Sequence, residues 1–439
     1  MTSAARLLAW ISQLPPSVRA LGWALLALGA NGYVLGTTDQ SIHLTFLRKL
    51  MDPSLFAGDL VADAAAARPS LFWQIQAPLF ARLGFGAMPA VYATVWFASL
   101  IATFWMYDRL ALSLGSKWWA PALLVVFHCV PGHARTFEPE LINRTVAQPL
   151  VLGALWCALA GELELGAMVA GFAFLLHATT ATHVFGILCV MALVRPRAFP
   201  AILAGFGLFA APLLLGRPHG ELWVDDAWMH VLAWRMPHHL FPWTWPAGVW
   251  VVAAVYFALC VAGRQRAVVT GVMIWSTIAT LGWRVAPILA LHAWESWILL
   301  AIVGLLCVPK WLPSRWLPLA ILLALPWEEH LMGRPIERAF TFTPAIDQAL
   351  LDDVRAAPDG PVSVSPFAPA WLRPWSGRAL YVTTKDGGEA VFSREFAMAW
   401  RTRLAVACGE DVLAGQPTDW LGYRGVREAC AAALDRKGN

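Results

Sequence analysis

Residues 18–36 read "VRALGWALLALGANGYVLG", and this stretch decides the fold class. It is almost entirely apolar, and it is long enough to cross the hydrocarbon core of a membrane, about 30 Å thick, as one helix. A cleavable signal peptide would be a single short apolar region, whereas many further apolar segments follow this one. We therefore interpret the stretch as an uncleaved first membrane span.

The composition of the whole chain agrees with a membrane protein. The 439 residues are 59% hydrophobic and 14% charged, whereas about 25% of the residues of an ordinary soluble domain are charged. The formal net charge is +4, and no block of Lys and Arg forms the basic patch that nucleic acid requires. We expect membrane lipids as partners and no nucleic acid.

Apolar segments that could serve as spans recur as far as residue 327, and the short ones are expected to be paired or tilted in the membrane. They predict about eleven spans, approximately at 18–36, 90–114, 118–131, 146–160, 165–178, 181–194, 198–216, 246–262, 267–282, 286–308 and 315–327. The segment 71–86 carries Gln74, Gln76 and Arg82, so an interfacial or re-entrant helix is expected there instead. The sequence therefore predicts an α-helical polytopic membrane domain over residues 1–327.

The basic residues of the short turns indicate the orientation of the chain. If the N-terminus is cytoplasmic, alternating spans place these basic residues on the same side: Arg6, Arg19, Arg109, Lys117, Arg195, Arg197, Arg264, Arg266, Lys310 and Arg315. The first outer loop, 37–89, then faces the exterior, together with the loops near 132–145 and 217–245 and the chain after residue 328.

Polar side chains gather directly after the first span, in "TTDQSIHLTFLRKLMDPSLFAGDLVAD" at 37–63. Asp39 and His43 are four residues apart, so they would share one face of an amphipathic helix on the membrane surface. Asp59 lies further along the same loop. Asp52 and Asp63 are equally well explained as solvated loop residues.

Three more outer segments carry ionisable groups. Ionisable side chains at membrane depth are costly and tend to face a cavity or each other. Together they predict a polar cavity that opens outward. The alternatives are that Arg and Glu pair inside the bundle and that the Trp residues are interfacial anchors. The candidate residues are His133, Arg135, Glu138 and Arg144 in 128–149, Arg235, His238 and His239 in 217–246, and Arg284 before a later span.

The segment 128–149 is also a candidate site for a divalent metal. His133, Glu138 and Glu140 have suitable donor atoms, but their spacing matches no established zinc signature. The sequence firmly implies no cofactor, and no residue is assigned to a metal.

The composition changes after about residue 328. "GPVSVSPFA" and "RALYVTTK" alternate as strands do, and "SREFAMAWRTRLAVAC" has helical spacing. These patterns predict a small soluble α/β domain over 328–439, outside the cytoplasm. Cys408 and Cys430 lie in its polar sequence, and we expect them to form a disulfide; two buried free thiols are the alternative.

This layout resembles the GT-C superfamily of polyprenyl-phosphate-dependent glycosyltransferases and oligosaccharyltransferases. In that family a catalytic acidic residue follows the first span, many spans come next, and a soluble outer domain often ends the chain. Asp39 in "TTDQSIH" matches the position of the acidic residue. Gln40 stands where a second acidic residue is common, so Asp59 is the candidate second carboxylate.

The chain is also similar to uncharacterised bacterial membrane proteins. They share "DQ" after the first span, an "R-x-P-H-H" loop, and a terminal domain with elements that match Arg378, Lys385, Trp400 and Arg403. This likeness implies a multi-pass protein of the bacterial inner (plasma) membrane and brings no established activity.

The GT-C resemblance implies transfer of a sugar from a polyprenyl-phosphate donor to an acceptor on the outer face of the membrane. Asp39 would deprotonate the acceptor hydroxyl, and His43 would orient that carboxylate or share the proton. Arg residues would stabilise the phosphate leaving group, and Arg144, Arg235 and Arg284 are the candidates. The alternatives are a transporter or flippase of an amphiphilic anion and a non-catalytic subunit of an envelope complex.

Overall fold

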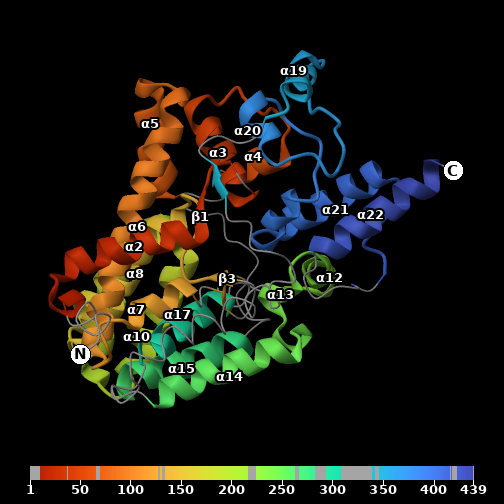
Figure 1. The fold of residues 1–439 in the computed structure, drawn as a ribbon. Helices are drawn as coiled ribbons and strands as arrows, with labels where there is room; N and C mark the ends of the chain where they lie inside the picture. Colours follow the sequence, from red (N-terminus) through yellow and green to blue (C-terminus); the bar gives the residue numbers. More distant parts are fainter. Residues whose placement is uncertain are drawn as a thin grey trace.

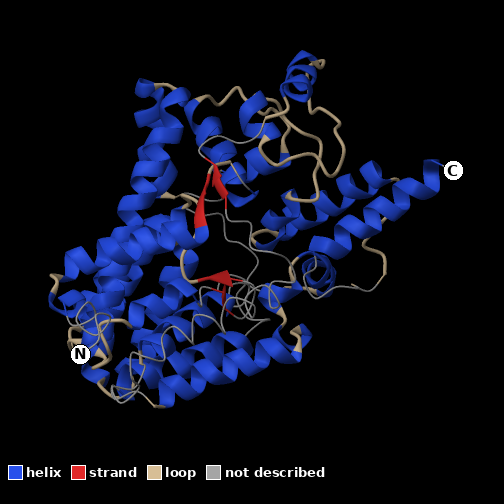
Figure 2. Cartoon of the chain, viewed as in Figure 1, coloured by secondary structure: helices blue, strands red, loops and turns tan. Residues whose placement is uncertain are grey.

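The computed structural model describes residues 10–36, 38–65, 70–126, 129–130, 134–215, 224–262, 266–281, 293–307, 339–341, 346–415, 417 and 423–438. Helices make up most of this part of the chain (Figures 1 and 2). Helices occupy each apolar segment that the sequence analysis expected as a span between residues 18 and 308, and the segment 315–327 lies outside the described residues. These helices are α2 (Pro16–Asn31), α6 (Met88–Ser113), α7 (Ala120–Val126), α8 (Asn143–Leu159), α9 (Leu163–Leu176), α10 (Ala178–Ala192), α11 (Phe199–Leu215), α14 (Ala247–Val261), α15 (Arg266–Leu281) and α17 (Ala293–Leu306).

Length distinguishes these helices from one another. Among the described residues, Phe85–Ser113 and Pro196–Leu215 are long and apolar enough to cross a membrane, and the other apolar helices are shorter. A helix rises 1.5 Å per residue, so about 20 residues are needed for a span perpendicular to the membrane. The count of about eleven spans therefore stays a prediction.

The first apolar stretch is helical over a shorter length than expected. Its helix α2 ends at Asn31, and Gly32 has a φ of 74°, a conformation that favours glycine. Residues Gly32–Val34 then form the strand β1, which pairs in parallel with β4 (Ala339–Thr341). The end of the predicted span is thus a strand joined to the C-terminal region.

Close helix contacts hold the bundle together. A Cβ atom at Gly171 of α9 would lie 2.7 Å from the carbonyl oxygen of Phe206 in α11, and one at Gly304 of α17 would lie 2.8 Å from that of Tyr256 in α14. Small residues at such crossings let helix backbones approach closely, as in membrane helix packing. Arg19 of α2 donates two hydrogen bonds to Asp108 near the end of α6, at 3.0 and 2.7 Å, so the start of α2 lies beside the end of α6.

The loop 37–89, which the sequence predicts to be an outer loop, contains three helices, α3 (Thr38–Met51), α4 (Leu60–Ala64) and α5 (Leu71–Leu83). Helix α5 packs against the beginning of α6, where the hydroxyl of Tyr92 donates to Gln76 at 2.6 Å. The described part of the loop 217–246 contains α12 (Asp226–Arg235) and α13 (Pro237–Leu240).

The C-terminal region is mainly helical where it is described. It contains α19 (Gln348–Ala356), α20 (Leu372–Ser376), the 3-10 helix η6 (Asp386–Val391), α21 (Arg394–Cys408) and α22 (Tyr423–Gly438). The two segments expected as strands do run side by side in parallel, but they share one isolated bridge, between Val362 and Leu380. Proline removes the backbone donor that a ladder needs, and Pro361 and Pro366 flank this bridge. The α/β character expected for the region therefore stays a prediction.

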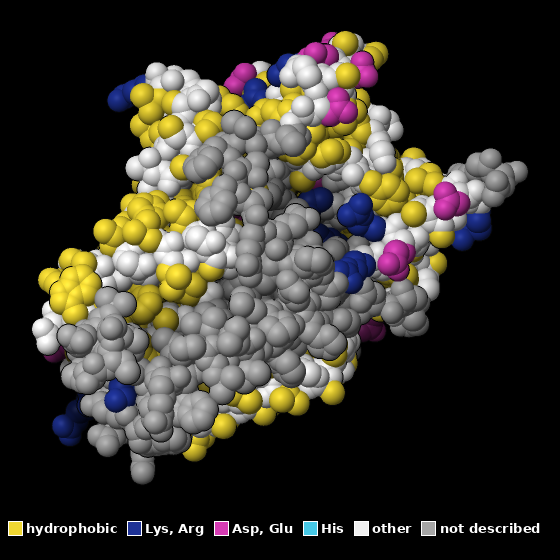
Figure 3. Space-filling model, viewed as in Figure 1, with side chains coloured by type: hydrophobic (Ala, Val, Ile, Leu, Met, Phe, Trp, Pro, Cys, Tyr) yellow, Lys and Arg dark blue, Asp and Glu magenta, His cyan; other side chains and the backbone are white. Residues whose placement is uncertain are grey.

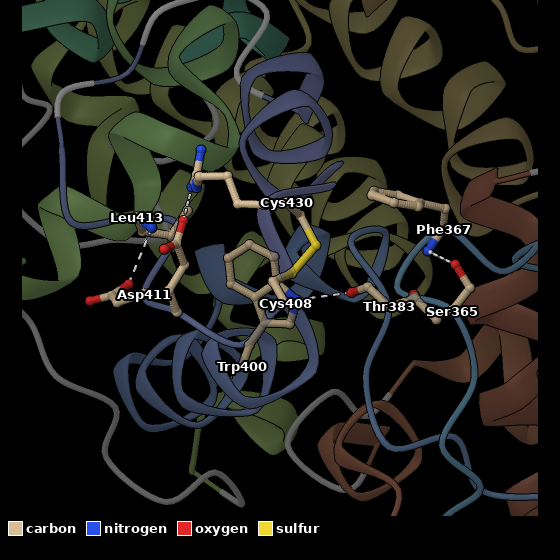
Figure 4. Close-up of a disulfide and its surroundings, with 10 residues drawn as sticks. Ser365, Phe367, Thr383, Trp400, Cys408, Asp411, Leu413 and Cys430 are labelled. Carbon is tan, nitrogen blue, oxygen red and sulfur yellow. Dashed lines mark hydrogen bonds and ion pairs between the residues drawn. A yellow bond between two sulfur atoms is a disulfide. The ribbon is translucent and has the colours of Figure 1, made fainter. Parts of the chain in front are cut away.

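The expected disulfide is present. Cys408 at the end of α21 is bonded to Cys430 of α22, with a Cα–Cα distance of 5.3 Å, and both residues are fully buried. Figure 4 shows the bond beside Trp400, whose indole donates to the carbonyl of Thr383 at 3.0 Å. The bond joins the last two helices of the chain.

Side-chain character differs between the two ends of the molecule. Charged side chains gather over α19 to α22, whereas hydrophobic side chains run along the edge formed by α14 (Figure 3). The exposed apolar residues of the bundle helices include Leu21, Leu25 and Leu26 of α2, Leu203, Leu208 and Leu215 of α11, Val251, Val255 and Val261 of α14, and Ile274, Ile278 and Leu281 of α15.

Candidate functional site

The acidic residue after the first apolar helix lies where the bundle, the outer loop and the C-terminal region meet. Asp39 stands in the first turn of α3. The neighbouring Gln40 fixes this turn, because its amide accepts from the backbone N–H of Gly36 and donates to the carbonyl of Leu141 at 3.0 Å. Gln40 is fully buried, whereas the Asp39 side chain is 52% exposed. Gln40 thus anchors the turn that presents Asp39.

Lys385, directly before η6, is the partner of Asp39. Its ammonium donates to Oδ1 of Asp39, and the two residues are 346 positions apart in the chain. The charge of Lys385 is the main cause that lowers the pKa of Asp39, and Arg144 and His43 lower it further against the opposing effect of burial. Asp39 is therefore a carboxylate that pairs with Lys385 and whose pKa is lowered by it.

Arg144, in the first turn of α8, is one of those groups. It forms an ion pair with Glu138, and its Nη1 lies 3.9 Å from Oε1 of Glu295. Its guanidinium lies 4.7 Å from the centroid of the Trp294 ring. The buried Nε of Arg144 has no hydrogen-bond partner among the residues that the structure describes. Among the described residues, protein groups therefore orient this side chain, and its Nε donor stays unused.

Glu295, in the first turn of α17, joins Arg144 to α10. Its carboxylate accepts from the hydroxyl of Thr179 at 2.9 Å and from that of Thr180. The Nε2 of His177 lies 3.9 Å away. Only 1% of the Glu295 side chain is exposed, so a buried carboxyl supports the arginine from the side of the bundle.

The two histidines of α13 reach the same place. The ring of His239 stacks on Trp294 with 4.7 Å between centroids, and the ring of His238 lies 4.0 Å from that of His239. Trp294 therefore contacts both His239 and Arg144. Residues of the segments 128–149 and 217–246 therefore meet at this tryptophan, and the polar cavity expected from the sequence stays a prediction.

Helix α12 connects this cluster to the C-terminal region. Arg235 donates to the carbonyl of Lys385 at 3.4 Å. Trp228 donates to Ala390 at 2.8 Å, Trp234 donates to Gly415 at 3.0 Å, and His230 contacts the carbonyl of Leu413. Trp228 and Trp234 are thus buried docking residues, whereas the sequence had also allowed them as membrane-surface anchors; Trp243, 57% exposed, still fits that interpretation.

His43 faces aromatic side chains of α3 and α5. Its ring lies 5.2 Å from that of Trp73, 6.4 Å from Phe72 and 6.5 Å from Phe46. It remains close enough to influence the pKa of Asp39. The expected role of His43, orienting Asp39 or sharing its proton, stays a prediction.

Asp59 is placed differently from the sequence expectation. It is fully buried, and its Oδ1 accepts from the backbone of Val61 and Ala62 at the start of α4. Its Oδ2 accepts from Nε of Arg373 at 2.7 Å and from the backbone of Leu380 at 2.8 Å. Because four donors occupy the carboxylate, we assign Asp59 to docking of the C-terminal region instead of to a catalytic pair with Asp39.

Some candidates cannot be located in this geometry. His133 and Arg284 lie outside the described residues, and for Arg135 the structure describes the strand β3 (Ala134–Arg135), paired with β2 (Cys129–Val130), but not the side chain. No group of three or more His, Cys, Asp and Glu residues that could hold a metal occurs in the described part.

Lys385 was not among the site residues expected from the sequence. Its signal in the sequence is weak, because Lys385 stands out only as part of a terminal-domain element that similar bacterial proteins share. Trp294 was likewise not assigned, because a single aromatic residue at the end of an apolar segment has no distinctive pattern. Glu295, which lies at the end of a predicted span as Arg284 does, was expected to face the outward polar cavity but received no role in binding.

A comparison with protein families, with curated proteins and with solved structures gives no match for this chain. Its function is therefore inferred from the site.

Proposed function

We propose that the protein is a membrane glycosyltransferase that transfers a sugar from a polyprenyl-phosphate donor to an acceptor on the outer face of a bacterial inner membrane. One observation carries the proposal. An exposed carboxylate, Asp39, follows the first apolar helix, pairs with Lys385 from a distant part of the chain and is influenced by the charge of Arg144. A base beside cationic groups is the combination that this transfer requires.

The chemistry follows from these charges. The acceptor oxygen attacks the anomeric carbon as the bond from that carbon to the phosphate oxygen breaks, and Asp39 takes the acceptor's proton. The lipid phosphate leaves with the bonding electrons, and its negative charge is stabilised by Arg144 and by Arg235, which lies next to Lys385. A single displacement of this kind inverts the anomeric centre and needs no covalent enzyme intermediate.

The bundle surface supports the membrane part of the proposal. Isolated exposed apolar residues are ordinary, but contiguous apolar faces are rare on soluble monomers. The outward residues of α11, α14 and α15 are repeatedly Leu, Val and Ile with large exposed fractions. Lipid is the environment in which such faces are stable.

The test uses the full-length protein in lipid nanodiscs with polyprenyl-phosphate-linked hexoses labelled in the sugar. Released polyprenyl phosphate and labelled product are followed with a bacterial envelope extract as the source of acceptor. Asp39→Asn should lower turnover by about a hundredfold or more, the scale for losing a general base. Asp52→Asn is the control, because Asp52 is an exposed carboxylate of the same loop bound to Ser54. Equal turnover in Asp39→Asn and wild type would remove Asp39 from the mechanism.

The runner-up function is transport or flipping of an amphiphilic anion. The unused donor of Arg144 favours it, since that nitrogen can bind an anion without any reaction. Two results together would support this function. A labelled lipid phosphate would cross the bilayer equally well with wild type and with Asp39→Asn, and the wild type would transfer no sugar. A non-catalytic envelope subunit would show neither activity.

A further inference from the structure

We propose that Lys385 is an anion-binding residue of the site and that Asp39 occupies it in the unliganded protein, so that the phosphate of the lipid donor takes Lys385 and frees the Asp39 carboxylate. The inference rests on the proposed function for the identity of the phosphate carrier. Binding of that phosphate can nevertheless be measured without any turnover.

The exposure of the two side chains is the first argument. The side chain of Lys385 is 23% exposed and that of Asp39 is 52% exposed. By contrast, in the ion pairs of Arg373 with Asp59 and Asp386 each side chain is at most 4% exposed. The ion pairs of Arg373 are thus closed to a ligand, whereas the pair of Lys385 and Asp39 is open to one.

The strength of the pair is the second argument. Partly exposed ion pairs contribute about 0–1 kcal/mol, so separating this one costs little. The phosphate of the lipid-linked sugar is a diester with one negative charge and two free oxygens, like a carboxylate, so it can form charge-assisted hydrogen bonds with the ammonium group in place of Asp39. Exchange of Asp39 for the donor phosphate at Lys385 therefore costs little.

The unused donor of Arg144 is the third argument. The charge of this arginine lowers the pKa of Asp39. Its Nε has no partner among the described residues. A phosphate that replaces Asp39 as the partner of Lys385 could accept from Arg144 as well.

Exchange would couple donor binding to base strength. While Lys385 holds Asp39, the pKa of the carboxyl is lowered and the carboxylate is a weak base. Once the phosphate binds Lys385, Asp39 loses its contact with the ammonium group and gains a negative charge nearby. Both changes raise the pKa of the Asp39 carboxyl. Asp39 then becomes a stronger base when the donor is in place.

The experiment measures binding of polyprenyl phosphate to the full-length protein in phosphatidylcholine nanodiscs by native mass spectrometry. Lys385→Met should weaken binding about tenfold or more, the loss expected for one charged hydrogen bond. Asp39→Asn should tighten binding about two- to fivefold, because Lys385 no longer has a competing partner. Lys49→Met is the control, since Lys49 of α3 binds the backbone carbonyls of Pro53 and Leu55.

The opposite signs of the two effects make the test decisive. Weaker binding in both variants would show that the ion pair only supports the fold, and unchanged binding in Lys385→Met would show that Lys385 does not contact the anion. Either result overturns the inference. Polyprenol, which lacks the phosphate, should bind equally to wild type and Lys385→Met.

Inorganic phosphate distinguishes the source of the anion. It should compete with polyprenyl phosphate only at much higher concentration, and tighter binding of inorganic phosphate than of the lipid would overturn the lipid assignment. The expected binding changes without sugar transfer would refute the proposed function and leave this inference standing. If Lys385→Met loses sugar transfer while its binding of polyprenyl phosphate is unchanged, this inference is overturned and the proposed function stands.

Discussion

Arg373 of α20 donates from Nε to Oδ2 of Asp59 at 2.7 Å, although 314 positions separate the two residues. The same guanidinium forms two hydrogen bonds with Asp386, at 3.0 and 2.9 Å. Burial alone would lower the pKa of Arg373, but the two carboxylates outweigh that effect and raise it. Asp386 directly follows Lys385, so this triad sets the position of the lysine that meets Asp39.

Replacing Arg373 with Met should therefore disrupt docking of the C-terminal region. The variant leaves two buried carboxylates without their partner, which typically costs about 3–5 kcal/mol. Thermal unfolding and limited proteolysis of the purified protein measure the effect. Arg355→Met is the matched control, because Arg355 pairs with Asp352 on the surface, where both side chains are about half exposed. Equal stability of the two variants would contradict a docking role for the triad.

Gly387 should not tolerate a side chain. A Cβ atom there would lie 2.5 Å from the ring of Trp400, which is fully buried and cannot move away. Overpacking of this kind costs about 1–3 kcal/mol, so Gly387→Ala should lower the midpoint of thermal unfolding. The neighbouring Gly388→Ala provides the control, because the nearest atom to its Cβ would be Nη2 of Arg235 at 3.6 Å, an ordinary contact. A smaller effect in Gly387→Ala than in Gly388→Ala would show that the packing is different.

Acid should weaken the contact between Asp39 and Lys385. The folded protein holds the pKa of Asp39 below its ordinary value of 3.8, so the stability from this contact is present above pH 4 or so and is lost as the pH falls toward the lowered value. Asp39→Asn lacks this contribution at every pH. The difference in unfolding temperature between wild type and variant should therefore shrink on acidification. Added salt should also reduce it, because the side chains are partly exposed. A difference that grows at low pH would contradict the assignment.

The helices of the bundle could be predicted from the sequence because a long apolar segment has few other ways to satisfy its backbone. The end of the first helix could not be placed, since the pairing of β1 with β4 joins segments that are about 300 residues apart. The two expected strands near Val362 and Leu380 show why alternation alone misleads. The same alternation occurs in an extended loop when prolines remove the ladder donors.

The candidate site could be predicted only in part. Its position after the first apolar helix was readable, because a polar cluster there is unusual in so apolar a chain. The different roles of Asp39 and Asp59 were not readable, since both are acidic residues of one loop. Their roles depend on whether Lys385 or Arg373 lies opposite, and local sequence patterns carry no information on such distant pairing.

The orientation of the chain predicts where the C-terminal region lies. If the basic turns are cytoplasmic, residues after 328 are outside the cytoplasm. Fusions after Leu350 of a reporter that is active only outside the cytoplasm should be active, and those of a cytoplasmic reporter should be inactive. A fusion after Arg195, in a turn expected to be cytoplasmic, gives the opposite pattern as control. Reversed activities would reverse the topology.

The disulfide between Cys408 and Cys430 should stabilise the C-terminal region and report its compartment. The bond closes a loop with a sequence separation of 22, for which the chain-entropy estimate is about 3 kcal/mol. Cys408→Ser and Cys430→Ser should therefore lower the unfolding temperature by similar amounts, and the double variant should be no worse than either one. Cys189→Ala, which removes a free cysteine of α10, serves as the control.

Thiol labelling tests the bond directly in the unreduced, unfolded protein. Peptides that contain Cys408 and Cys430 should be labelled only after reduction, whereas the peptide with Cys189 is labelled before it. Disulfides persist in oxidising compartments and are rare in the cytosol, so protein purified from the membrane should carry the bond without added oxidant. If both cysteines are labelled before reduction, the bond does not form in the cell, and the outer location of this region loses the support that the bond gives it.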